Sequence, residues 1–180
     1  MHRTHNRVAL SVLTAVVILV VAYPALAAST SNISATVTVQ NISVSTTGPI
    51  AFGVVAAGSA TVASDSSVVT NDGNVAETFS LNVTSPSGWT AVQAAPGSEE
   101  YCLSGMLNAA KPASGDFSYA NDALSVTATS CSVSKFAGDQ TGVSVAASGT
   151  RNLWFKFQAP SATTATTQKT ITVTVTASAA

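Results

Sequence analysis

A two-residue alternation of apolar and polar side chains runs through most of the chain after residue 28, and it restricts the fold more than any other feature. It is clearest near the C-terminus, where Ile171, Val173 and Val175 alternate with four threonines. Successive side chains of a strand point to opposite faces, so this pattern predicts a strand with one face in a core. No helical period longer than one turn follows Ala27. The sequence therefore indicates an all-β protein.

Other segments of the same kind follow one another at short spacing, separated by turn residues. The segments that we expect to be strands are 33–44, 50–54, 67–70, 75–83, 89–93, 101–107, 124–128, 152–158 and 169–177. The turn from Asn71 to Asn74 predicts a hairpin over 67–84, with Glu77 near an end that water reaches. About eight to ten short strands with frequent turns predict an immunoglobulin-like antiparallel β-sandwich.

The first expected strand changes its apolar parity. Ile33, Ala35, Val37 and Val39 share one face, whereas the apolar positions after Gln40 fall on the other parity. A change of parity favours a bulge or a move from one sheet to another.

The N-terminus has the layout of a secretory signal peptide. Two arginines precede an uncharged run of 15 mostly apolar residues from Val8 to Ala22, and Ala25 and Ala27 form an A-x-A cleavage site. We therefore expect a signal peptide at 1–27 that is cleaved, and a single secreted or cell-surface domain at 28–180. The alternative is an uncleaved anchor, but the run is shorter than the roughly 20 residues that span a bilayer as a helix. After cleavage we expect no membrane span.

The charge pattern excludes several classes of function. Residues 28–180 hold 5 basic and 8 acidic side chains, a formal charge of −3, so the basic surface that binds nucleic acid is missing. Both histidines, His2 and His5, belong to the predicted signal peptide, which removes histidine-dependent catalysis and histidine-ligated metal sites. A weakly charged surface rich in Ser, Thr and Asn has little self-repulsion and favours close packing between copies.

Two cysteines, Cys102 and Cys131, are present in the predicted domain. In an oxidising compartment such a pair most simply forms one intrachain disulfide, which the chain-entropy model credits with about 3 to 4 kcal/mol for a loop of this length. The alternative is two free thiols, neither of which has a basic neighbour in the sequence to activate it.

Two stretches resemble known exported proteins. The string IAFGVVAAGS at 50–59, followed by VTNDGNVAETFSL at 69–81, resembles the opening half of immunoglobulin-like domains of exported prokaryotic proteins. More loosely, the chain is similar to camelysin and TasA-type matrix proteins, secreted β-sandwich subunits of extracellular fibres. This resemblance implies polymerisation through an N-terminal strand that is donated to a neighbouring copy.

Catalytic and metal-binding residues are not indicated. Glu99 and Glu100 are a candidate glycosidase pair, but adjacent residues of a strand point to opposite faces and would not meet at one bond. Five aspartates lie in expected loops without forming the calcium-binding pattern, and turn formation explains them equally well: Asp65, Asp72, Asp116, Asp122 and Asp139. We expect a protein that is not an enzyme, with no cofactor and no metal site.

The most aromatic expected strand offers one candidate contact surface. Trp154 and Lys156 lie on its polar parity, opposite Leu153, Phe155 and Phe157. There they could stack on a sugar ring or anchor a protein interface. The alternative is that Trp154 belongs to the core, either because the parity of the strand is the reverse of the one assigned or because both of its faces are covered.

The sequence leads to two main hypotheses. The first is a noncatalytic structural subunit of an extracellular fibre, layer or matrix, in which residues 29–45 complete the sheet of a neighbour. Its partners would be other copies or other surface proteins. The second is a carbohydrate-binding or adhesive module that uses Trp154 and Lys156. A carboxylate-based or metal-dependent hydrolase is the third and weakest reading.

Overall fold

The structure is a computed structural model that describes residues 29–180. The predicted signal peptide, residues 1–27, and its cleavage site lie outside the described residues. Residues 38–180 form one compact unit, and the described residues 29–37 belong to a second unit. Residues 29–37 form no helix or strand, and the side chains of Ile33 and Val37 are exposed.

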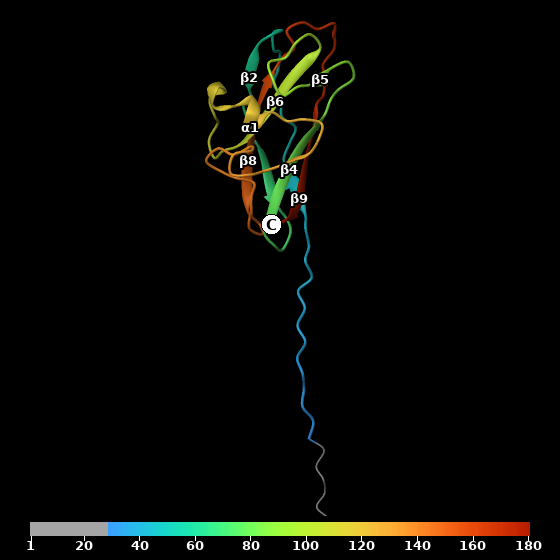
Figure 1. Ribbon diagram of the computed structural model, residues 1–180, viewed down its shortest axis with the longest axis vertical. Coiled ribbons are helices and arrows are strands. Elements are labelled where there is room, and N and C mark those ends of the chain that lie inside the picture. The colour runs from blue at the N-terminus through green and yellow to red at the C-terminus, as the bar shows by residue number, and fades with distance from the viewer. Residues whose placement is uncertain (1–28) are drawn as a thin grey trace, which may run out of the picture. The chain divides into compact units, whose positions relative to one another are not determined.

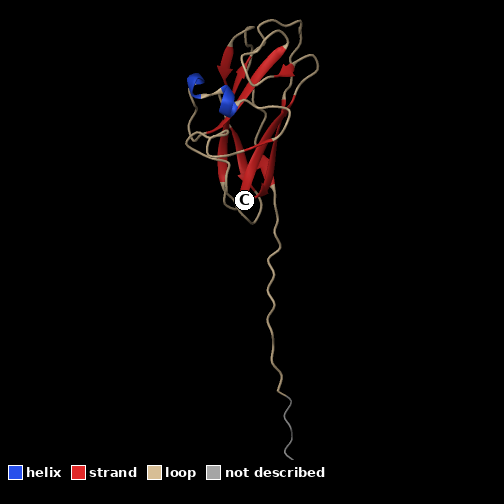
Figure 2. Ribbon diagram, viewed as in Figure 1, coloured by secondary structure: helices blue, strands red, loops and turns tan. Residues whose placement is uncertain are grey.

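The compact unit is mostly β, which confirms the all-β prediction (Figures 1 and 2). Its helical segments are short, a 3₁₀ turn at Ser114–Asp116 and the four-residue α1 at Tyr119–Asp122. The strands are β1 (Val44–Thr46), β2 (Ala60–Val62), β3 (Ser67–Asn71), β4 (Glu77–Thr84), β5 (Thr90–Ala91), β6 (Glu100–Leu107), β7 (Thr129–Ser130), β8 (Thr150–Gln158) and β9 (Thr172–Ala179).

The strands form two sheets that differ in size and direction. The larger sheet has the order β1-β3-β8-β6-β5, and β2 pairs with β8 beyond the end of β3. Because β5 runs parallel to β6, this sheet is mixed, and it curls into a half-barrel. The smaller sheet, β7-β4-β9, is antiparallel. The chain is therefore not a clear immunoglobulin sandwich, and the prediction of a wholly antiparallel sandwich is corrected.

The predicted hairpin over 67–84 is wrong. The turn after Asn71 is present, but β3 pairs with β1 and β8 whereas β4 pairs with β7 and β9. The turn thus carries the chain from one sheet to the other. Glu77, expected near water, is fully buried, and its Oε1 accepts a hydrogen bond of 2.8 Å from the backbone N–H of Ser43.

Three expected strands are not formed over the ranges predicted for them. Residues 50–54 and 124–128 form no strand, and of the segment 33–44 only Val44 belongs to one. An alternating pattern becomes a strand only where a neighbouring backbone pairs with it. For 50–54, no such neighbour is present in the part of the chain that the structure describes.

The core lies between the two sheets. Phe79, Leu81 and Val83 of β4 face it from the smaller sheet, each about 1% exposed. Leu153 of β8 and Tyr101 of β6 face it from the larger sheet. In β4 and β8 the inward positions are those that the alternation predicts, because one sheet face meets the core and the other does not.

The predicted disulfide is not formed. Cys102 and Cys131 are both unpaired and buried. Tyr101 and Leu103 of β6 point into the core, so the side chain of Cys102 between them lies on the other face of the sheet, where its Sγ is 3.8 Å from the Ser104 hydroxyl. Cys131 belongs to the core itself. A sheet therefore separates the two thiols, and strand parity explains why they do not meet.

Candidate functional site

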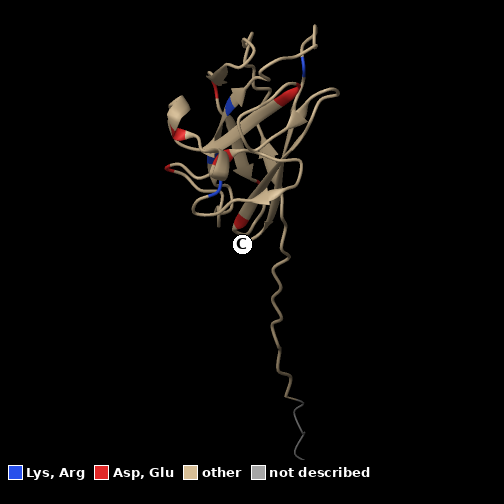
Figure 3. Cartoon of the chain, turned by 45° about the horizontal axis from the view of Figure 1, so that its top comes forward, with Lys and Arg blue, Asp and Glu red and all other residues tan. Residues whose placement is uncertain are grey.

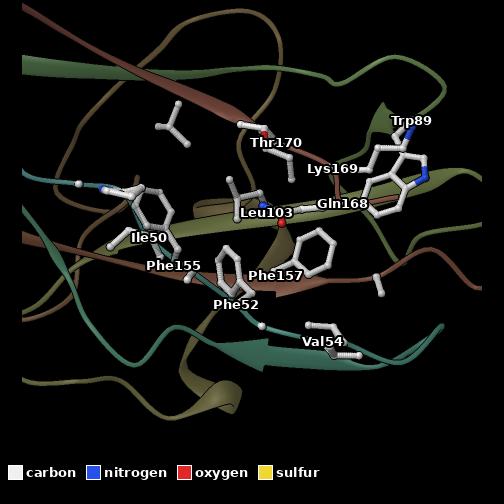
Figure 4. A pocket seen from close by; sticks show the side chains of 18 of the residues that line it. Ile50, Phe52, Val54, Trp89, Leu103, Phe155, Phe157, Gln168, Lys169 and Thr170 are labelled. Atoms are coloured by element: carbon white, nitrogen blue, oxygen red, sulfur yellow. The ribbon is translucent and has the colours of Figure 1, made fainter. Parts of the chain in front are cut away.

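An apolar groove opens on one side of the core of the compact unit (Figure 4). It has a volume of about 1060 Å³. Leu103 and Phe157 of the larger sheet form its floor, and Phe52 packs on Phe157 with 5.4 Å between ring centroids. In Figure 4, Val54 lies on one side of the groove and Thr170 on the other. The groove is thus a region where core side chains remain open to solvent.

Both long walls of the groove have unpaired backbone. One wall is β9, which pairs with β4 along one edge and with no other strand among residues 29–180. The other wall is the segment 48–55, none of whose N–H or C=O groups has a backbone partner in the described part of the chain. Strand edges with free N–H and C=O groups are templates for pairing with another chain. The groove therefore offers apolar burial and main-chain hydrogen bonding together.

The two walls also carry apolar side chains at alternate positions. Ile171, Val173 and Val175 from one wall and Ile50 and Phe52 from the other are half-buried at the groove. Val54 at its rim is fully exposed. Alternate apolar positions along both walls match the two-residue period of an extended chain laid between them.

A hydrogen-bonded rim closes one end of the groove. The indole N–H of Trp89 donates to the Thr163 hydroxyl at 3.0 Å, and that hydroxyl donates to Glu99 Oε2 at 2.8 Å. Glu99 also accepts from the backbone N–H of Thr164. These hydrogen bonds, chiefly the backbone one, hold the pKa of Glu99 below its ordinary value. Glu99 thus holds the loop before β9 in place. From the sequence, Glu99 was considered only as one member of a possible catalytic pair with Glu100.

Trp154 and Lys156 do not form an open aromatic face. Both side chains are half-buried on the outer face of β8. The indole N–H of Trp154 donates to the carbonyl of Asn108 at 2.9 Å, and the Lys156 ammonium donates to the carbonyl of Ser114 at 2.8 Å. Segment 108–114 thus covers both residues, which agrees with the alternative that both faces of the strand are covered.

Several acidic side chains accept hydrogen bonds from backbone N–H groups nearby. Glu100 Oε2 accepts from the N–H of Gly97, whereas Glu99 binds the loop at 163–164, so the two carboxylates have different partners. Asp116, Asp122 and Asp139 each accept a backbone N–H within loops or at a helix start. Burial raises the pKa of Asp122. Within 29–180 no group of three or more His, Cys, Asp and Glu side chains is placed to hold a metal ion.

The charges give no sign of an electrostatic binding surface. Figure 3 shows the few Lys, Arg, Asp and Glu residues of the compact unit scattered over loops and strand ends. Among residues 29–180, no helix has both the length and the apolar character to cross a membrane.

The groove was not identified from the sequence, although its residues were. The alternation at 50–54 and 171–175 correctly marked side chains that face the core. What the sequence did not reveal is that these two segments lie across from each other with a gap between them. A comparison of the chain with protein-family models, curated proteins and solved structures finds no match, so the candidate site is defined by this geometry alone.

Proposed function

We propose that this protein is a noncatalytic, exported structural subunit that polymerises into an extracellular fibre, layer or matrix by strand donation. In each contact, the segment 29–38 of one copy lies in the groove of the next. This segment is shorter than the 29–45 expected from the sequence, because residues 39–46 are already hydrogen-bonded within their own subunit. The observation that carries the proposal is the pair of unpaired backbone walls around an apolar groove, in a chain that also holds an exposed alternating segment.

The donor segment has the chemistry that the groove requires. Ile33, Ala35 and Val37 share one parity, and the exposed fractions of Ile33 and Val37 are 93% and 87%. Full burial of such a side chain is worth about 1.5 to 3 kcal/mol, and each new main-chain hydrogen bond adds about 1 kcal/mol. The intervening Ser34 and Thr36 would point toward solvent, as the alternation requires.

The proposal also accounts for the departure from a sandwich. A donated strand beside β9 extends the smaller sheet from three strands to four, and its second edge is available to segment 48–55. With the strand in place, a four-stranded smaller sheet and the mixed larger sheet would enclose the core. We therefore propose that the immunoglobulin-like arrangement expected from the sequence is completed only between copies.

The test compares two charge substitutions in the donor segment. The chain from Ala28 to Ala180 is purified and examined by electron microscopy and size-exclusion chromatography. Val37→Asp places a carboxylate on the parity that enters the groove and is expected to abolish polymers. Thr36→Asp is the matched control, since it adds the same charge one residue away on the outer parity, and it should polymerise.

A synthetic peptide of residues 29–38 provides a second test. It is expected to bind the Val37→Asp subunit, whose groove is intact, and to raise its melting temperature. Polymers of Val37→Asp that match those of the unsubstituted chain would contradict the proposal, as would the absence of polymers from the unsubstituted chain at any concentration.

A carbohydrate-binding role for Trp154 and Lys156 has less support, because both side chains already donate to backbone carbonyls. It predicts that Trp154→Ala loses glycan retention on a glycan array without a lower melting temperature. A lower melting temperature with unchanged retention would favour the packing role.

A further inference from the structure

Five hydrogen bonds hold the segment 39–43 against the turn that joins β3 to β4. Asn74 contributes three of them. Its Nδ2 donates to the Val39 carbonyl at 2.7 Å, its Oδ1 accepts from the Asn41 N–H at 2.8 Å, and its own N–H donates to the Asn41 carbonyl at 3.1 Å. The other two join Ser43 to the N–H of Asp72 and to Glu77 Oε1, each at 2.8 Å. We call this set of contacts the N-terminal clamp.

The clamp is also closely packed at Gly73. A Cβ added to Gly73 would lie 2.5 Å from the Asn41 carbonyl oxygen and 2.3 Å from Glu77 Oε1, so only glycine fits beneath the segment. Glu77 is fully buried, and its second carboxylate oxygen has no hydrogen-bond partner among residues 29–180. Bonds to alternate residues 39, 41 and 43 keep this stretch extended.

The clamp and the groove lie in opposite directions from β1. Val44 pairs with Asn71, so the residues before β1 continue along the turn that follows β3. The residues after β1 lead into segment 48–55 and the groove. The same separation exists along β9, where Ala179 pairs with Glu77 beside the clamp, whereas Ile171, Val173 and Val175 line the groove.

We infer that the N-terminal clamp, and Asn74 in particular, holds residues 39–43 along the turn between β3 and β4, and that this favours donation of residues 29–38 to another copy over insertion into the groove of the same subunit. This inference rests on the proposed function. To enter the groove of its own subunit, the chain would have to reverse its direction in a tight turn. Glycine and proline favour such turns, and the stretch 29–43 contains neither. Asn74 is thus a positioning residue that decides between a polymer and a self-completed monomer.

The test releases the clamp without touching the groove or the donor. Asn74→Ala removes two side-chain hydrogen bonds from an exposed position and is expected to raise the ratio of monomer to polymer about tenfold. Asp72→Ala is the matched control, because Asp72 is exposed in the same turn and its side chain makes no hydrogen bond in the described part of the chain. It should polymerise like the unsubstituted protein.

Hydrogen exchange of the monomer fraction gives the second readout. In the Asn74→Ala monomer, amides of residues 31–37 should become protected, since the strand now completes its own subunit. A flexible Gly-Ser linker inserted between Thr38 and Val39 leaves the clamp intact and should produce the same protected monomer, which covers the case in which Asn74→Ala fails to fold.

Each outcome separates the two proposals. If Asn74→Ala and the linker variant polymerise like Asp72→Ala while Val37→Asp does not polymerise, strand donation stands and the clamp inference is wrong. Monomers in which residues 31–37 stay unprotected would also overturn the inference. If Val37→Asp polymerises normally, strand donation itself is wrong.

Discussion

The two sides of the core contain similar residues but differ in how their backbones are paired. On the closed side, β4, β6 and β8 are each paired on both edges, and Phe79 and Leu153 are about 1% exposed. On the open side, within residues 29–180, β9 has one free edge and segment 48–55 has no backbone partner, and Val54 is fully exposed. Apolar content alone therefore does not decide whether a segment is buried. The presence of a neighbouring strand does, and on the open side no strand among residues 29–180 pairs with β9 there or with segment 48–55.

Truncation of one phenylalanine on each side tests whether the closed and the open side of the core differ in packing. Phe79→Ala should cost about 3 to 5 kcal/mol of unfolding free energy because it leaves a cavity in closed packing. Phe52→Ala at the groove should cost well under half of that, since its side chain is already partly solvated. Urea denaturation in the monomeric Val37→Asp background measures both. Equal costs would mean that the groove is closed in solution.

Alanine substitutions at two glycines test how closely the closed side is packed. A Cβ at Gly142 would lie 2.6 Å from Cys131 Sγ and 2.9 Å from Cys131 Cβ, so Gly142→Ala should destabilise the fold by about 1 to 3 kcal/mol. Nothing lies within 4 Å of the Cβ position of Gly115, and Gly115→Ala should change stability by less than about 0.5 kcal/mol. Thermal unfolding of the two variants compares them directly. A tolerated Gly142→Ala would show that the closed side has room.

The rim of the open side should respond to acid. The pKa of Glu99 is lowered from 4.5, so its carboxylate favours the folded loop at pH values above 4.5, and that contribution is lost as the pH falls through the lowered pKa. Below that point, the Thr164 amide should lose its protection relative to an unstructured peptide at the same pH, and Trp89 fluorescence should change. Glu99→Gln should abolish this pH response. A response that persists in Glu99→Gln would assign it to another group.

The smallest effect concerns the thiols and tests the separation of the two sheet faces. Burial raises the pKa of Cys131 to about 12 and also raises that of Cys102, so neither thiol should react with a thiol reagent in the native protein at neutral pH. After unfolding in denaturant without reductant, both should react. Intact mass lower by two hydrogens in the purified protein would show that a disulfide forms after all.

Sequence reasoning was accurate for segments whose pattern and pairing agree. The alternations in 75–83, 152–158 and 169–177 gave three long strands of the structure and their inward faces. It failed where pairing is decided by distant parts of the chain. The turn at 71–74 is present as predicted, yet its flanking strands join different sheets, since β3 pairs with β8 and β4 with β9. The candidate site was missed for the same reason, since a groove is a relation between two segments more than 100 residues apart.

Side-chain periodicity by itself determined that this chain is built of strands and which of their positions face a core. These properties depend on local geometry, because the direction of a side chain along a strand follows from its parity alone. Only the tertiary structure decided which strands pair, that the two cysteines lie on different faces of a sheet, and that the core stays open beside β9. Pairing depends on main-chain hydrogen bonds, in which every residue can accept and every residue except proline can donate, so the order of strands does not follow from side-chain type.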